Sequence, residues 1–269
     1  MPFQLVKTAQ TAAVAGAIAL SGAAMAAQVN LTITAANLAP TNSISFAPLH
    51  FGVHSGVFDA FNIGAVAGAA IISVAEGGVG GAWQTEFGLA DPGAVRGTIA
   101  GLLQPGQTRS LSVQVDTAIN PFFTFAAMAV PSNDFFIGND SPTRFRLFDA
   151  TGALLITSIG QKANQIWDNG SEVLDPAAAA FVGNNDLRTN QNSVVAFNFG
   201  EFAAYNGLTT AAGYVFNSAL PAQSDVYRLS FAVAAVPEPE TFAMMAAGLL
   251  VLGTVAWRRR PNERTSLAG

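Results

Sequence analysis

Three acidic residues offer the clearest chemistry in this chain: Asp134, Asp168 and Glu172. Asp168 and Glu172 stand four residues apart around Gly170 and follow an apolar pair. A loop of this composition lets two carboxylates and a backbone carbonyl point at one centre, as oxygen ligands do around Ca²⁺ at about 2.3–2.6 Å. If Asp134 joins them, three like charges repel one another unless a cation binds. The residues therefore predict a calcium site, and solvated turn-forming acids are the alternative.

Asp134 needs an element to position it, and residues 121–130 supply one. Bulky apolar residues fall on both faces of this segment, which is typical of an internal strand. Pro131 cannot donate to a β-ladder, and the Ser-Asn-Asp sequence after it favours a turn. Three apolar residues then follow. We therefore predict that Asp134 lies at the tip of a strand, between two buried anchors.

Two other sets of side chains offer weaker chemistry. His50 and His54 have the i, i+4 spacing of a zinc pair on a helix, but residues 45–53 have an extended pattern, which separates the two rings. Glu76 and Glu86 are nominal candidates for the paired acids of a glycoside hydrolase. No phosphate loop, nucleophile elbow or His-Glu-x-x-His motif occurs. We predict no catalytic activity, with a carbohydrate-active hydrolase as the alternative.

The C-terminal tail has the chemistry of a membrane signal. A Pro-Glu-Pro sequence precedes an uncharged apolar stretch at residues 241–257, and three arginines follow that stretch. The residues of the two flanking elements are Pro237, Glu238, Pro239, Arg258, Arg259 and Arg260. As a transmembrane helix the stretch is roughly 25 Å long, enough for a thin bilayer, and the arginines belong on the cytoplasmic side.

Residues 237–260 resemble the PEP-CTERM sorting signal of exopolysaccharide-producing Gram-negative bacteria. The resemblance implies transient anchoring in the inner membrane, cleavage near the Pro-Glu-Pro sequence by an exosortase-type enzyme, and release to the cell surface or matrix. A permanent tail anchor is the alternative.

The first 26 residues have the pattern of a signal peptide. Lys7 precedes an apolar run at residues 12–20, and Ala24, Met25 and Ala26 supply the small-x-small cleavage pattern. We predict export and a mature N-terminus at Ala27. A short N-terminal core helix is the alternative.

Residues 27–236 remain for the folded part, a length usual for one large β-sandwich. The chain carries 12 Lys and Arg against 17 Asp and Glu, a formal net charge of −5. This balance argues against a nucleic-acid partner and favours divalent cations. The chain contains no Cys, so neither disulfides nor thiolate chemistry contributes.

Hydrophobic alternation predicts an all-β fold, an antiparallel β-sandwich with one short helical segment. The predicted strands are residues 29–35, 109–115, 194–199 and 227–233, with a hairpin joining 145–148 to 154–157. The helical segment is residues 65–76, and its Ala and Gly content makes it marginal.

Several landmarks follow one another along residues 27–236. One motif comprises Met128, Pro131, Ser132, Asp134, Phe136 and Gly138, and residues 30–40, 75–78 and 104–106 add further matches. This pattern resembles the spondin-type domain. The resemblance implies an extracellular, C2-like β-sandwich with no catalytic activity and an acidic loop that carries Asp168 and Glu172. Glu172 stands where that family usually has Asp.

These observations predict an exported calcium-binding adhesion or interaction module at the cell surface or in an exopolysaccharide-rich biofilm matrix. Its predicted partners are the processing enzyme and extracellular polysaccharide or surface proteins. A hydrolase or lectin acting on exopolysaccharide is the alternative. Only Trp83 and Trp167 lie outside the apolar tail, too few for an extended sugar-stacking platform.

Overall fold

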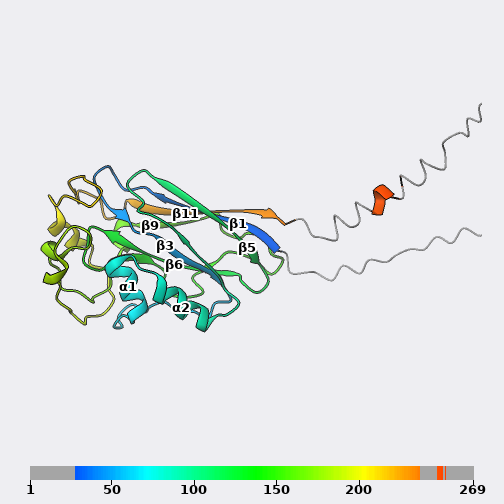
Figure 1. The fold of residues 1–269 in the computed structure, drawn as a ribbon, viewed down its shortest axis with the longest axis horizontal. Coiled ribbons are helices and arrows are strands. Elements are labelled where there is room, and N and C mark those ends of the chain that lie inside the picture. Colours follow the sequence, from blue (N-terminus) through cyan, green and yellow to red (C-terminus); the bar gives the residue numbers. More distant parts are fainter. Residues whose placement is uncertain (1–27, 237–246, 251, 253–269) are drawn as a thin grey trace, which may run out of the picture.

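Two antiparallel sheets pack against each other in the computed structural model, which describes residues 28–236, 247–250 and 252 (Figure 1). The four-stranded sheet has the order β5 (Thr108–Asp116), β1 (Gln28–Asn37), β11 (Asp225–Ala235) and β9 (Ser158–Lys162). The seven-stranded sheet has the order β10 (Trp167–Asp168), β7 (Phe135–Gly138), β6 (Phe122–Val130), β3 (Leu49–His54) and β4 (Val95–Ile99), with β2 (Ser45–Phe46) and β8 (Phe145–Arg146) also paired to β6. This arrangement is consistent with the predicted β-sandwich.

The four-stranded sheet confirms three predicted strands. β1 pairs with both β5 and β11, and its residues Leu31 and Ile33 are completely buried against the other sheet. On the opposite face the Thr32 and Ser112 hydroxyl groups lie 2.8 Å apart in a cross-strand hydrogen bond. Alternation between an apolar inner face and a polar outer face is what a half-buried antiparallel strand requires.

β6 confirms the prediction that both of its faces are buried. Phe123 and Phe125 point into the core between the sheets. Ala126, on the other face, packs in a second core that lies under two helices. An internal strand covered on both sides has no solvent face, so polar alternation is lost from its sequence.

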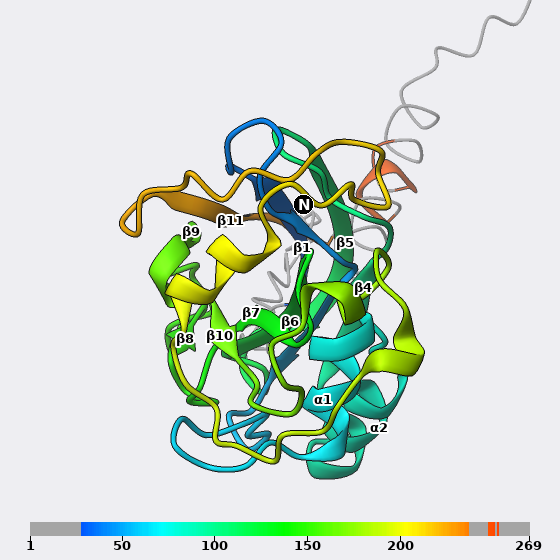
Figure 2. The ribbon, with the colours of Figure 1, turned by 90° about the vertical axis from the view of Figure 1, so that its left-hand side faces the viewer.

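The second core is covered by α1 (Ala69–Gly77) and α2 (Gly81–Ala90), which lie on the outer side of the seven-stranded sheet (Figure 2). The sequence predicted one helix at residues 65–76, so α1 confirms that prediction in part and α2 was missed. Trp83 and Phe87 of α2 are completely buried. A Cβ on Gly52 would lie 2.2 Å from the Phe87 ring, so α2 packs this closely only because β3 has glycine at that position.

The predicted strand at residues 194–199 is wrong. The segment makes only isolated bridges, from Val66 to Val194 and from Asp168 to Ala196. It leads into the 3₁₀-helix η4 (Phe199–Tyr205). Two separate neighbours hold the segment, so no continuous ladder forms, and Phe197 is 44% exposed.

The predicted hairpin at residues 145–157 is reduced to β8 and an isolated bridge between Phe148 and Leu154. Its turn is as expected, because Gly152 has a φ of 82° and its N–H donates to the Asp149 carbonyl. The Asp149 side chain also accepts from the Thr151 and Ala153 N–H groups, so this turn is held locally.

The loops between β10 and β11 gather at one end of the sandwich, opposite the end where β1 begins and β11 stops (Figures 1 and 2). They contain the 3₁₀-helices η2 (Pro176–Ala178), η3 (Asn185–Leu187) and η4, and η1 (Ala163–Gln165) precedes β10. At the other end, Val29 of β1 pairs with Ala235 of β11, so the first and last strands lie side by side there.

The predicted signal peptide at residues 1–26 lies outside the described residues, as does most of the predicted transmembrane helix at 241–257. Residues 247–250 and 252 are helical. Across the part of the chain that the structure describes, every helix is too short or too polar to cross a bilayer.

Candidate functional site

Asp134 is a buried carboxylate that holds the loop end of the sandwich together. Its Oδ2 atom accepts hydrogen bonds from the N–H groups of Ser171 (2.8 Å) and Glu172 (3.0 Å) and from the Ser171 hydroxyl (3.2 Å). Only 3% of Asp134 is exposed. The residue lies in the turn between β6 and β7, as the sequence predicted, and it fastens that turn to the chain after β10.

Asp168 lies beside Asp134 because β10 pairs with β7, where Asp168 is opposite Phe135. Its Oδ1 accepts from the Gly170 N–H at 2.8 Å, and its Oδ2 accepts from the Asn198 side-chain amide. Burial, and then the negative charge of Asp168, raise the pKa of Asp134 to about 7, against the hydrogen bonds from Ser171 and Glu172. The structure therefore brings together two of the three predicted carboxylates.

Glu172 faces different partners. Its Oε1 lies 3.2 Å from Nη1 of Arg188, and the same nitrogen lies 3.9 Å from Oε2 of Glu76. Burial, and then the charge of Glu76, raise the pKa of Glu172 to about 7, and Arg188 acts in the opposite direction. Throughout the described residues, no group of three or more His, Asp and Glu side chains is placed to hold a metal ion. The three predicted ligands thus divide into a carboxylate pair and a separate ion-pair cluster.

One feature of the carboxylate pair fits a small cation. The Asn169 side chain is completely buried, and its Oδ1 atom has no hydrogen-bond partner among the described residues. Its Nδ2 donates to the Ser171 hydroxyl, which in turn donates to Asp134. The Asn169 N–H donates to the Asp134 carbonyl at 3.2 Å, and neutral amide oxygens together with carboxylates are ligands that Ca²⁺ takes. Calcium binding remains a prediction, with Asn169 as an additional oxygen donor.

The turn that carries Asp134 is supported from a distance. The Tyr205 hydroxyl donates to Asn133 Oδ1 at 2.6 Å and accepts from the Asn133 N–H at 3.1 Å. Burial raises the pKa of Tyr205, so the hydroxyl keeps its proton. Tyr205, Asn198 and Arg188 could not be assigned from the sequence, because long-range packing alone brings these residues to the site.

The two histidines behave as the extended pattern predicted. Both lie on β3 under the helical layer, and four residues along a strand place their Cα atoms about 13 Å apart. His50 Nε2 donates to the Gly78 carbonyl at 3.1 Å, and His54 Nδ1 accepts from the Gly56 N–H at 3.1 Å. Burial lowers the pKa of His50 and lowers that of His54 to about 4. They are neutral core residues that satisfy buried polar groups.

Glu76 and Glu86 do not share a site. Glu76 lies at the end of α1 against Arg188, whereas Glu86 is on the exposed side of α2. Glu76 instead shares Nη1 of Arg188 with Glu172, at 3.9 Å and 3.2 Å respectively.

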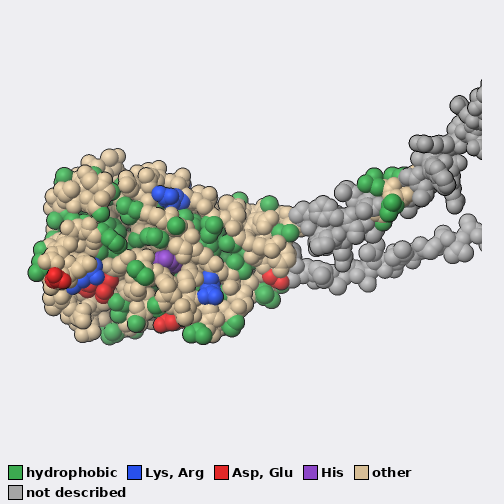
Figure 3. Space-filling model, in the orientation of Figure 1, with side chains coloured by type: hydrophobic (Ala, Val, Ile, Leu, Met, Phe, Trp, Pro, Cys, Tyr) green, Lys and Arg blue, Asp and Glu red, His purple; other side chains and the backbone are tan. Residues whose placement is uncertain are grey.

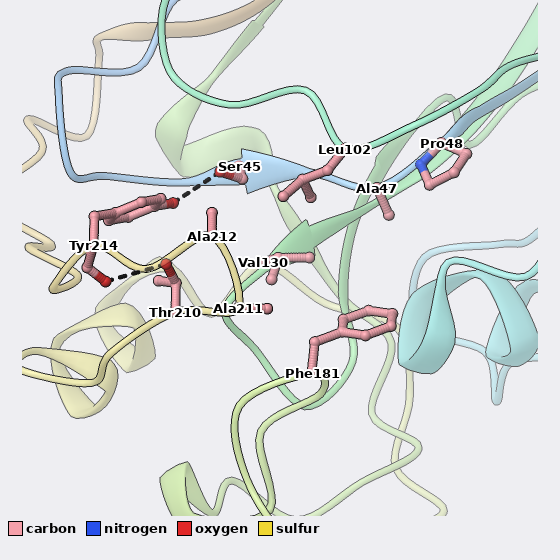
Figure 4. Close-up of a pocket in the computed structure, with 10 residues that line it drawn as sticks. All are labelled: Ser45, Ala47, Pro48, Leu102, Val130, Phe181, Thr210, Ala211, Ala212 and Tyr214. Carbon is pink, nitrogen blue, oxygen red and sulfur yellow. Dashed lines mark hydrogen bonds between the residues drawn. The ribbon is translucent and has the colours of Figure 1, made fainter.

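An apolar pocket of about 210 Å³ opens beside β2, between Phe181 and the 210–214 loop (Figure 4). The Tyr214 hydroxyl donates to the Ser43 carbonyl at 2.7 Å and lies 2.8 Å from the Ser45 hydroxyl. These polar atoms are thus already paired within the protein. The pocket therefore has an apolar lining but, among the described residues, no unpaired polar group that could orient a ligand.

We expect the domain to become more stable as the pH falls from 7 to 5. The folded state keeps a proton on Asp134 that the unfolded state releases above about pH 4. The free energy of unfolding should therefore be about 2 kcal/mol higher at pH 5 than at pH 7 from this group alone. Denaturant titrations at both pH values measure the difference.

Asp134→Asn is the matched control, because it cannot titrate and keeps a side-chain oxygen for the Ser171 and Glu172 N–H groups. The pH dependence of this variant should be flatter than that of the natural protein, and Glu172 accounts for part of what remains. Identical pH dependence in both proteins would contradict the assignment.

Comparison with known proteins identifies one region. Residues 235–260 match the PEP-CTERM protein-sorting motif. A search of curated proteins gives no match. The motif implies passage through the membrane and exosortase-dependent sorting to the cell surface. It includes the predicted sorting residues, which lie outside the described residues. Nothing in these comparisons supports a spondin-type domain, and that resemblance remains a prediction.

Proposed function

We propose that this protein is a non-catalytic interaction module that is displayed at the cell surface and binds extracellular polysaccharide or surface proteins through its loop end. The observation that carries the proposal is the position of the sorting motif, which begins at residue 235, where β11 ends. β11 ends on the side of the sandwich opposite the loops (Figure 1). The loops therefore lie at the end of the sandwich farthest from the point where the sorting motif begins.

The character of the surface supports a polar, uncharged partner. Only 11% of the residues are charged, and charged side chains are few and scattered on the face in Figure 3. A nucleic-acid partner requires a dense basic surface to neutralise phosphates. Hydroxyl-rich polysaccharide requires hydrogen-bonding groups and apolar contacts instead.

Calcium has a structural role in this proposal. A bound Ca²⁺ would relieve the repulsion between Asp134 and Asp168, with Asn169 Oδ1 as a neutral ligand. Because the Asp134 turn holds the chain after β10, the ion would stabilise the loops that face the partner. Asp134 and Asp168 orient that turn through their hydrogen bonds to Ser171 and Gly170.

Replacement of Pro237 and Pro239 by Ala should block processing. We expect the variant to accumulate as a membrane-bound precursor, because the motif that the exosortase recognises is lost while the hydrophobic stretch remains. Cell fractionation and mass spectrometry of the C-terminal peptide measure the result. In the natural protein the surface form should end between residues 237 and 240.

Exchange of Pro221 for Ala, outside the motif, is the matched control and should leave processing unchanged. A natural surface form that still contains Trp257 and Arg258 would instead indicate a permanent anchor.

A further inference from the structure

A cleft of about 330 Å³ lies at the side of the sandwich, where the edges of the two sheets separate. β9, the edge of the four-stranded sheet, contributes Gly160 and Gln161, and the seven-stranded sheet contributes Trp167 of β10 and Phe145 of β8. This volume falls within the range of small-ligand pockets. None of the predicted carboxylates lines the cleft, so it is distinct from the Asp134 site.

Gln161 is the unusual residue in this cleft. It shares the inward face of β9 with Ile159, a core residue, and pairs across the ladder with buried Tyr227. Only 8% of Gln161 is exposed, and its Oε1 has no hydrogen-bond partner in the described parts of the chain. A buried acceptor without a partner destabilises the folded state, and an apolar side chain fits the pattern of the strand better. The acceptor therefore points to a donor that the described chain does not supply.

An aromatic platform lies on another wall. The Phe197 ring stacks on the Trp167 ring with centroids 3.9 Å apart and an interplanar angle of 21°. Trp167 is held in place because its Nε1 donates to the Gly138 carbonyl at 3.3 Å. Trp167 is 8% exposed and Phe197 is 44% exposed, so the Trp167 ring is buried and the Phe197 ring keeps a large solvent-facing surface.

The rim supplies both donors and acceptors. Arg144 is exposed, and within the described residues its guanidinium makes no ion pair or hydrogen bond. Gln165 accepts from the Lys162 N–H through Oε1, which leaves its Nε2 to donate. In the part of the chain that the structure describes, the Asp140 side chain accepts only one hydrogen bond, from the Ile63 N–H to Oδ1. The Asn139 side chain already accepts from the Phe125 N–H and donates to the Thr124 hydroxyl, so it contributes only to the shape of the cleft.

We infer that this cleft is a binding subsite for one pyranose unit of a polysaccharide, with the sugar ring against Phe197 and a hydroxyl donating to Gln161 Oε1. A sugar has an apolar C–H face, which packs against an aromatic ring. Its hydroxyl groups both donate and accept hydrogen bonds, and side-chain amide groups can satisfy both roles. The assignment rests on the proposed polysaccharide-binding function and names the residues that perform it.

The test measures binding of the full chain to polysaccharide extracted from the producing cells, with dextran and polygalacturonate as neutral and acidic comparisons. Affinity electrophoresis gives the dissociation constant, and tryptophan fluorescence reports on Trp167. Phe197→Ala and Gln161→Leu should each weaken binding about tenfold or more. Gln161→Leu removes the unpaired oxygen, so its Tm should equal or exceed that of the natural protein.

Phe181→Ala is the matched control, because Phe181 is an exposed phenylalanine (57%) that does not line this cleft. It should bind like the natural protein. If the natural protein binds and both cleft variants bind equally well, the subsite is overturned and the proposed function stands. If the correctly sorted protein binds none of the three polysaccharides, polysaccharide binding is overturned together with the subsite. A structure with saturating ligand that shows only water at Gln161 also overturns the subsite.

Discussion

Asp134→Ala is expected to lower the free energy of unfolding by about 2–4 kcal/mol, because it leaves two buried N–H groups and a hydroxyl without an acceptor. These donors belong to Ser171 and Glu172, which are 9% and 3% exposed. Water therefore replaces the carboxylate poorly as a hydrogen-bond acceptor. For a domain of this size the loss corresponds to about 5–15 °C in Tm. Thermal and denaturant unfolding followed by circular dichroism measure it.

Two controls separate the hydrogen bonds from other effects. Asp134→Asn retains an oxygen acceptor and should keep most of the stability. Asp186→Ala removes an exposed acid from the loop that contains η3 and should change Tm very little. An Asp134→Ala protein that melts with the natural one would show that the turn after β10 is held without this carboxylate.

Calcium is expected to raise the Tm of the natural protein. For an extracellular module with a dissociation constant of about 10⁻⁴–10⁻³ M, calcium at one hundred times that value adds roughly 2.7 kcal/mol of stability. Asp134→Asn and Asp168→Asn should each abolish the increase. Mg²⁺ should substitute poorly, because this turn does not supply its strict octahedron. Melting curves at several calcium concentrations give the result.

Glu172→Gln tests whether Glu172 is a calcium ligand, as predicted from the sequence. Glu172 is paired with Arg188 rather than with Asp134, so this variant should retain the calcium response. If it loses the response, Glu172 is a ligand after all. If melting of the natural protein is indifferent to millimolar calcium and elemental analysis finds no metal, the acids serve only as turn residues.

The calcium effect should also depend on pH. Protonation of Asp134 below its pKa of about 7 competes with a cation for the same carboxylate. The calcium-dependent increase in Tm should therefore be smaller at pH 5.5 than at pH 8. An increase that is equal at both pH values would place the ion elsewhere.

Strong local patterns made the strands of the four-stranded sheet and β6 predictable. β1, β5 and β11 have a two-residue period because one face of each strand lies against the core, and β6 has apolar residues on both faces because both are buried. α2 was missed because only Trp83 and Phe87 are buried among its residues, so its apolar stripe is short, and its close approach to the sheet depends on Phe87 packing against Gly52.

The site was also predictable only in part, because some of its contacts are local and others depend on long-range packing. Asp134 could be placed at a strand tip from Pro131 and the turn residues around it. Its partners could not be assigned from spacing, because Asp168 reaches it through the pairing of β10 with β7. Glu172 has a suitable spacing from Asp168, yet Arg188 draws it to another cluster.

By itself, the sequence determined the sorting signal, the β-rich class and the position of Asp134 in a turn, since each depends on neighbours along the chain. Only the tertiary structure decided which carboxylates meet, which buried oxygens lack partners, and that Gln161 faces an aromatic cleft. These features arise where segments distant in sequence pack together. Residue type and spacing carry little information about such contacts, because long-range pairing and burial select them.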